Sequence, residues 1–126
     1  MMPAYNFKPQ FRNKILAGEK RHTIRAKRAR PPQVGDACHL FCGMRTKQCE
    51  LLGRFPCVKV EDILIARFAG DFEIKIDGVP LDASEKEALA RRDGFASLAE
   101  MAEFWERAHP RTVFFRGDVI HWRFPE

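Results

Sequence analysis

Four side chains that can do chemistry lie close together near the start of the chain: Lys20, His22, Thr23 and Arg25. A lysine or a histidine can act as a general base, and a threonine hydroxyl becomes a nucleophile when a neighbouring base takes its proton. An arginine guanidinium binds anions through a fork of donors. Residues 15–27 are therefore the first candidate for a catalytic or binding site.

The geometry of this segment depends on a bend. On a straight strand Lys20 and Thr23, three positions apart, would point to opposite faces. They share a pocket only if the backbone turns after Gly18. Beyond such a bend, Thr23, Arg25 and Lys27 would lie on one strand face. The alternative is a surface corner whose charges are solvated.

A short helix is expected to lead into the bend. Phe11, Ile15 and Leu16 sit at i, i+4 and i+5, and this spacing predicts one apolar helix face. Gly18 follows and can take positive φ, which is the usual way for a helix to end.

The size and composition are typical of one globular domain covering residues 1–126. Hydrophobic residues make up 45% of the 126 residues, enough for a normal core. No apolar run approaches the roughly 20 residues of a membrane span, and the first eight residues lack the apolar segment of a secretory signal. A cytoplasmic location is the expectation.

The net charge of +5 is distributed unevenly. Residues 1–30 hold nine Lys or Arg and one acidic residue, a local balance of +8, while the rest of the chain is net negative. A basic block favours an anionic partner, most commonly a nucleic acid, and RNA or a modified nucleoside is the expectation. A solubilising surface is the alternative.

The four cysteines are Cys38, Cys42, Cys49 and Cys57. Their gaps do not match the paired spacing of a structural zinc site. Cys38 and Cys42 lie in an apolar run and are interpreted as buried thiols. A metal site that uses His39 is the alternative, and neither a metal nor a cofactor is expected.

The elements expected along the rest of the chain are mostly strands. We expect strands at 37–42, 49–67 (one bent strand or two), 72–76, 79–81, 112–115 and 119–124, with a turn at 116–118 between the last two. Capping-box patterns at Ser84 and Ser97 predict helices from 84 to about 92 and from 97 to 108. Strands do not alternate with helices throughout, which disfavours a doubly wound parallel sheet. The sequence predicts an α+β fold, a small mixed β-barrel decorated with helices.

Several motifs together resemble those of ASCH domain proteins, which share the PUA-like barrel. They are Ile15-Leu16-Ala17-Gly18 with Lys20, Thr23 and Arg25; Val34-Gly35-Asp36; Asp93-Gly94-Phe95 before the Ser97 helix; and Gly117-Asp118-Val119-Ile120. These motifs span nearly the whole chain.

The resemblance implies three functions. One bacterial ASCH branch, the N4-acetylcytidine amidohydrolases, uses a lysine, a threonine and a glutamate, and Lys20 and Thr23 match the first two positions. Asp93, one methylene shorter, stands nearest to the third. Other members of the superfamily are implied to bind RNA without catalysis, and some resemble ribonucleases. An amidohydrolase is the first expectation, a non-catalytic RNA-binding module the second and a ribonuclease the third.

Amide hydrolysis would divide the roles among these residues. Thr23 would be the nucleophile and Lys20, if neutral, its base, which requires a lowered lysine pKa. Arg21 and Arg25 would favour the neutral lysine by like-charge repulsion. Asp93 would oppose that shift or pass a proton to the leaving amine.

Basic residues also suggest where a substrate would bind. A groove with Lys20, Arg25, Lys27 and Arg28 would hold an RNA backbone, and Arg21 is a further candidate for substrate binding. Arg25 is equally well explained as a structural ion pair.

Three ring-bearing side chains have weaker claims. His22 ranks below Lys20 as a base, because an extended segment would point it away from Thr23. On the last strand, His121 or Trp122 would be placed to stack on a base, but core packing is the preferred interpretation of Trp122.

Overall fold

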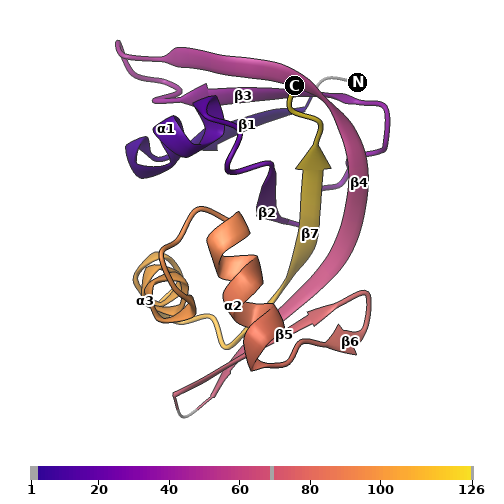
Figure 1. The fold of residues 1–126 in the computed structure, drawn as a ribbon, viewed down its shortest axis with the longest axis vertical. Helices are drawn as coiled ribbons and strands as arrows, with labels where there is room; N and C mark the ends of the chain where they lie inside the picture. Colours follow the sequence, from indigo (N-terminus) through magenta and orange to yellow (C-terminus); the bar gives the residue numbers. More distant parts are fainter. Residues whose placement is uncertain (1–2, 69, 126) are drawn as a thin grey trace.

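The computed structural model describes residues 3–68 and 70–125 (Figure 1). In chain order the elements are β1 (Ala4–Phe7), α1 (Pro9–Leu16), β2 (His22–Ala26), β3 (Ala37–Cys42), β4 (Glu50–Phe68), β5 (Asp71–Ile76), β6 (Val79–Pro80), α2 (Ala83–Arg92), α3 (Leu98–Ala108) and β7 (Phe114–Trp122).

The long strand β4 organises the sheet. It pairs antiparallel with β3, β5 and β7, and β7 in turn pairs with β2. The pair β1–β3 is parallel. Register shifts opposite Leu40/Phe41 and at Cys57/Lys59 mark bulges. Bulges bend a strand, and Figure 1 shows β4 curving around the three helices, which lie on its concave side.

The mixed α+β class predicted from the sequence is confirmed, but the predicted barrel does not close. Among the described strands, β1, β2 and β6 each pair with a single neighbour, so the sheet keeps open edges. The helices fill the concave side across which those edges would have to meet (Figure 1).

The apolar face of α1 is narrower than predicted. Phe11 and Ile15 are buried, but Leu16 is 41% exposed. Five positions correspond to about 140° around a helix, so Leu16 cannot share the face of Phe11.

The predicted cap of α2 is wrong by two residues, whereas that of α3 is confirmed. Asp82, not Ser84, caps α2: its carboxylate accepts from Glu85 N, and the Glu85 side chain accepts from Asp82 N. In α3 the Ser97 hydroxyl accepts from Glu100 N. Both caps satisfy amide groups that the first turn leaves unpaired.

The two strands predicted at the end of the chain form one continuous strand. The predicted turn at 116–118 lies inside β7, where Gly117 pairs with Ala26 on one side and Ile63 on the other. A Cβ on Gly117 would collide with the carbonyl oxygen of Arg25. The glycine therefore allows a close approach of β2 and does not form a turn.

The cysteine prediction is confirmed for its two named thiols. Cys38 and Cys42 are buried, as is Cys57, while Cys49 is exposed. Burial raises the pKa of Cys38 to about 12. Within residues 3–68 and 70–125, no three His, Cys, Asp or Glu side chains are grouped to hold a metal ion.

No helix in the described ranges combines the length and the apolar character that crossing a bilayer requires.

The cap of α2 provides a test of this fold. Asp82→Ala should lower the free energy of unfolding by about 1 kcal/mol, because Glu85 N loses its acceptor. Ser84→Ala is the matched control and should change it by only a few tenths of a kcal/mol. Urea unfolding measures both. Equal losses in the two variants would contradict the assignment of Asp82 as the cap.

Candidate active site

A cavity of about 310 Å³ lies between α1, α3 and β2. Its aromatic and apolar lining comes from Phe7, Phe11, Ile24, Ala26, Phe95, Phe104, Trp105, Ala108 and Phe115, and its polar lining from Asn6, Lys8, Lys20, Thr23, Arg25, Asp93 and His109. Ligand pockets of this kind are mostly apolar and carry a few polar groups that orient the ligand. The size is at the lower end of the range for small-molecule sites.

The backbone bends after α1 and turns the lysine inward. Gly18 has φ +75°, and the amides of Glu19 and Lys20 both donate to the carbonyl of Lys14, at 2.9 and 3.1 Å. A residue with positive φ ends the helix and reverses the chain. The bend thus brings Lys20 and Thr23 to the same cavity, as a shared site requires.

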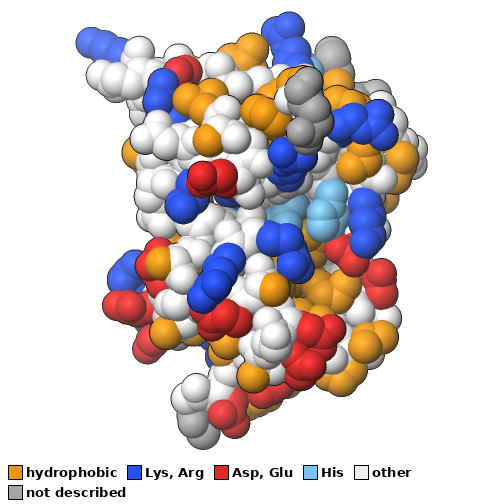
Figure 2. All heavy atoms as spheres, in the orientation of Figure 1, with side chains coloured by type: hydrophobic (Ala, Val, Ile, Leu, Met, Phe, Trp, Pro, Cys, Tyr) orange, Lys and Arg blue, Asp and Glu red, His pale blue; other side chains and the backbone are white. Residues whose placement is uncertain are grey.

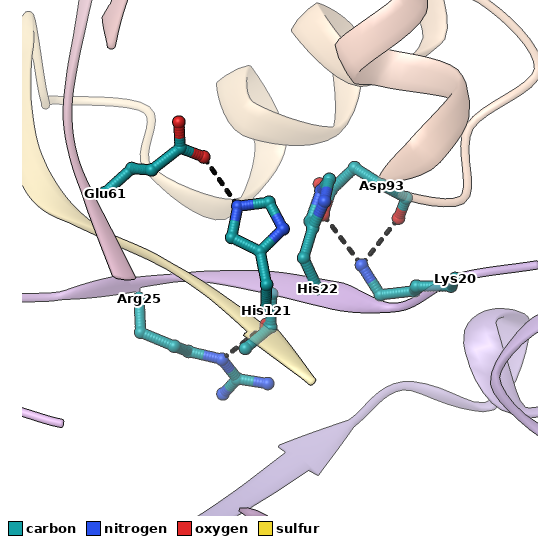
Figure 3. Close-up of polar contacts among 7 residues, drawn as sticks. Lys20, His22, Arg25, Glu61, Asp93 and His121 are labelled. Carbon is teal, nitrogen blue, oxygen red and sulfur yellow. Dashed lines mark hydrogen bonds and ion pairs between the residues drawn. The ribbon is translucent and has the colours of Figure 1, made fainter. Parts of the chain in front are cut away.

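Lys20 and Asp93 form an ion pair in the interior (Figure 3). Lys20 Nζ donates to Asp93 Oδ1 at 2.7 Å and to the Asp93 carbonyl oxygen at 2.6 Å. The two residues are 3% and 6% exposed. Asp93 stands at the end of α2, where Gly94 has φ +102°. A Cβ at Gly94 would lie 2.9 Å from Phe11 Cδ1 and 3.3 Å from Lys20 Cδ, so the glycine leaves room for both side chains.

Burial and pairing act against each other in this ion pair. Burial lowers the pKa of Lys20, and the Asp93 carboxylate opposes that shift. Burial would raise the pKa of Asp93, but the charge of Lys20 and the neighbouring His22 outweigh it and keep the pKa of the carboxyl below its usual value. The resting pair is therefore ionic, with a lysine that loses its proton more easily than a lysine in water.

Thr23 is held by an arginine. Arg25 Nε donates to Thr23 Oγ1 at 2.9 Å, and Arg25 Nη2 donates to the Asn6 carbonyl at 2.6 Å. The guanidinium also lies over the Phe7 ring, 4.9 Å from its centroid. Because Thr23 Oγ1 accepts this bond, its own proton stays available for transfer to a base.

His22 is part of the site, although its predicted rank was low. Its Nε2 lies 3.1 Å from Asp93 Oδ1, on the same carboxylate oxygen as Lys20. That distance would allow an ion pair if the imidazole were protonated, but Nε2 makes no hydrogen bond within the described residues. The even spacing of Lys20 and His22 was the signal that they would share a face.

A second histidine continues this polar cluster towards the surface. His121 is the cross-strand partner of His22, and the two rings lie edge to face with centroids 5.3 Å apart. His121 Nε2 lies 2.6 Å from Glu61 Oε1 (Figure 3). Trp122 beside it is buried, which confirms the preferred core role.

The basic residues predicted to bind substrate are not gathered in one groove. Lys27 pairs with Asp62 and Asp118 at 2.8 and 2.6 Å. Arg21 Nε donates to the Gly18 carbonyl, and the Arg21 guanidinium lies over the ring of Phe124. Arg21, Lys27 and Arg28 do not line the cavity.

The surface charge follows the asymmetry of the sequence. In Figure 2 lysine and arginine side chains are more numerous in the upper half of the face, and acidic side chains in the lower half. The upper half carries α1, β1 and β3 (Figure 1), two of which belong to the basic first 30 residues.

The burial of His22 makes a prediction about pH. Burial lowers the pKa of His22, against the effect of Asp93. Below about pH 6.5 an unfolded chain binds a proton at this histidine and the folded chain does not, so stability should fall as pH falls. His22→Gln should flatten that slope, which is at most about 1.4 kcal/mol per pH unit for one proton. Urea unfolding at pH 7 and pH 5 measures it, and equal slopes in variant and wild type would contradict the prediction.

Comparisons of this chain with protein-family models, with curated proteins and with solved structures find no match. The ASCH family expected from the motifs, and the activity it implies, therefore stay predictions. What the chain does has to be inferred from the chemistry of this cavity.

Proposed function

We propose that the chain is an amidohydrolase that removes the acyl group from an N4-acylated cytidine, free or within RNA. The observation that carries this proposal is the meeting of Lys20, Thr23 and Asp93 at one cavity, although the third lies 73 positions beyond the first. A base, a hydroxyl and an acid at one pocket are the groups that acyl transfer needs.

The lining of the cavity supports a planar ligand. Phe11, Phe95 and Phe104 contact one another edge to face or tilted, with centroids 5.2 to 5.8 Å apart. Trp105 lines the same space. Aromatic side chains bind nucleobases by stacking or edge contacts, whichever base is presented. A cytosine ring would bind against these side chains, with its acylated amine towards the polar residues.

The reaction needs Lys20 to give up its proton before it can act as a base. Transfer of that proton to Asp93 converts the ion pair into a neutral amine and a neutral carboxylic acid. The number of bound protons stays the same, and burial favours neutral groups. Neutral Lys20 then takes the proton of Thr23 as Oγ1 attacks the acyl carbon. Protonated Asp93 gives its proton to the departing cytidine amine.

Water completes the cycle. The acylation step leaves an ester on Thr23 and restores the ionic Lys20–Asp93 pair. Asp93 then accepts a proton from a water molecule as the water oxygen attacks the ester carbon. The acyl group leaves as the free carboxylic acid when Thr23 regains a proton from Lys20, and the proton on Asp93 then returns to Lys20 to restore the ionic pair.

The resemblance to ASCH domain proteins supports the same assignment. In the branch that hydrolyses N4-acetylcytidine the acid is a glutamate, and here it would be the shorter Asp93. The direct 2.7 Å contact with Lys20 supports the view that aspartate is long enough. The curved, helix-filled sheet is compatible with a PUA-like fold, which we include in the proposal.

A non-catalytic RNA-binding module is the alternative, and one observation favours it. Lys20 makes two short hydrogen bonds to Asp93 and has a carboxylate as counter-charge. Such a pair can serve as structure alone, with the lysine permanently charged. The two functions differ in whether Lys20 ever becomes neutral.

Hydrolysis of N4-acetylcytidine by purified protein is the direct test, with cytidine release followed by liquid chromatography. Thr23→Val should lower the rate by about 100-fold or more, because it removes the nucleophile and keeps the shape. Thr23→Ser should retain activity. Ser84→Ala, which removes a hydroxyl from α2 outside the cavity, is the matched control and should keep the wild-type rate.

Two outcomes would overturn parts of this proposal. If the wild-type protein releases no cytidine, it is not an amidohydrolase of N4-acylated cytidines. Turnover that survives Thr23→Val, in a variant whose melting curve matches the wild type, would remove Thr23 as the nucleophile.

The alternative makes its own prediction. As an RNA-binding module, the chain should bind a labelled single-stranded RNA with an affinity that falls with salt, by about 0.7 logarithmic units per phosphate contact for each tenfold rise in concentration. Arg28→Gln should reduce this slope. Lys27→Gln should not, because Asp62 and Asp118 already neutralise Lys27. Fluorescence anisotropy measures the slope, and a slope that no arginine substitution changes would argue against an RNA groove here.

A further inference from the structure

Two arginines near the cavity, Arg25 and Arg28, form no ion pair with an acidic residue in the part of the chain that the structure describes. Arg25 is half-buried, lines the cavity and has no carboxylate within ion-pair distance among the described residues. Arg28 is exposed and has none either within residues 3–68 and 70–125. Removing a guanidinium from water without a counter-ion is unfavourable, so this arrangement favours an anion from outside.

Backbone carbonyls of β1 accept hydrogen bonds from both guanidinium groups. Arg25 Nη2 donates to the Asn6 carbonyl at 2.6 Å, and Arg28 Nη2 to the Ala4 carbonyl at 3.2 Å. These carbonyls are two residues apart on the edge of β1 that faces away from β3. Two residues of a strand span roughly 7 Å, so the two carbonyl oxygens are about that far apart. Both guanidinium groups also lie over the ring of Tyr5, 5.5 and 4.4 Å from its centroid.

Donors remain free on both side chains. Arg25 uses Nε and Nη2, and Arg28 uses Nη2, in hydrogen bonds within the described structure. Their other guanidinium nitrogens have no partner among the described residues. Burial, and after it the positive charge of nearby Arg28, lower the pKa of Arg25.

We propose that Arg25 and Arg28 form a phosphate-binding subsite at the side of the cavity. It deepens, and rests on, the proposed function: the cytidine that enters the cavity is a nucleotide whose phosphate reaches these two arginines. Phosphate oxygens match the fork of a guanidinium, and a phosphate placed between two such forks replaces their repulsion by charge-assisted hydrogen bonds. The phosphate is that of a mononucleotide or of an RNA chain, and the test distinguishes the two.

Binding measurements with three ligands test the subsite without requiring hydrolysis. Isothermal titration calorimetry compares cytidine, cytidine 5′-monophosphate and the dinucleotide cytidylyl-3′,5′-cytidine. At least one phosphorylated ligand should bind about tenfold or more tightly than cytidine. A gain for the monophosphate alone identifies a mononucleotide site, and a gain for the dinucleotide identifies an RNA phosphate. Equal affinities for all three, or no binding of either phosphorylated ligand at millimolar concentration, overturn the proposal.

Variants show whether the gain comes from these residues. Arg28→Gln should remove most of the phosphate gain and leave cytidine affinity unchanged, because Arg28 does not line the cavity. Lys75→Gln removes one positive charge from β5 outside the cavity, and it is the control that should keep the gain. Arg25→Lys keeps the charge but loses the fork, and should also reduce the gain.

The outcomes separate this inference from the proposed function. A phosphate gain that depends on Arg28, in a protein that does not hydrolyse N4-acetylcytidine, supports the subsite and removes the amidohydrolase. Hydrolysis with no phosphate gain supports the enzyme and removes the subsite. A gain that Arg28→Gln and Lys75→Gln reduce equally would reflect net charge alone and overturn the assignment to these arginines.

Discussion

A lysine and an aspartate that are 73 positions apart form an ion pair in the interior, and the cavity depends on it. Burying either charge alone would cost several kcal/mol, so the two residues must arrive together and with good geometry. Lys20 comes from the bend before β2 and Asp93 from the end of α2. The pair therefore holds the bend before β2 against the end of α2, and Gly94, with no side chain, leaves space for Lys20 and Phe11 there.

The charges around the cavity divide into two kinds. Inside, Lys20 and His22 both contact Asp93 Oδ1, and the charge of Lys20 is balanced by that of Asp93, as a low-dielectric space requires. At the side, Arg25 and Arg28 are held by backbone carbonyls and keep their positive charge. A ligand that matches both regions has a flat, weakly polar part and an anionic part.

Sequence patterns predicted part of what depends on near neighbours and missed what depends on distant strands. The cap at Ser97 involves residues within one turn and was found, whereas the equally local cap of α2 was placed at Ser84 because Ser84 and Glu87 offer the same spacing as Asp82 and Glu85. Gly117 looked like a turn because its role, the approach of β2, depends on a strand far away in sequence. The contact of Asp93 with Lys20 came from a family resemblance and not from spacing. His22 was ranked low because it was judged by its position relative to Thr23, whereas its neighbour is Asp93 at the end of α2, which the pattern of β2 does not include.

The pairing of β2 has a consequence for biosynthesis. Among the described strands its single partner is β7, so residues 27–113 separate the two. Contacts between such remote segments form late. While the ribosome is still producing the later elements, the segment that carries Lys20 and Thr23 has no neighbouring strand to bind, and its many cations keep it hydrated. Ligand recognition at this pocket would then begin only after β7 has emerged from the exit tunnel.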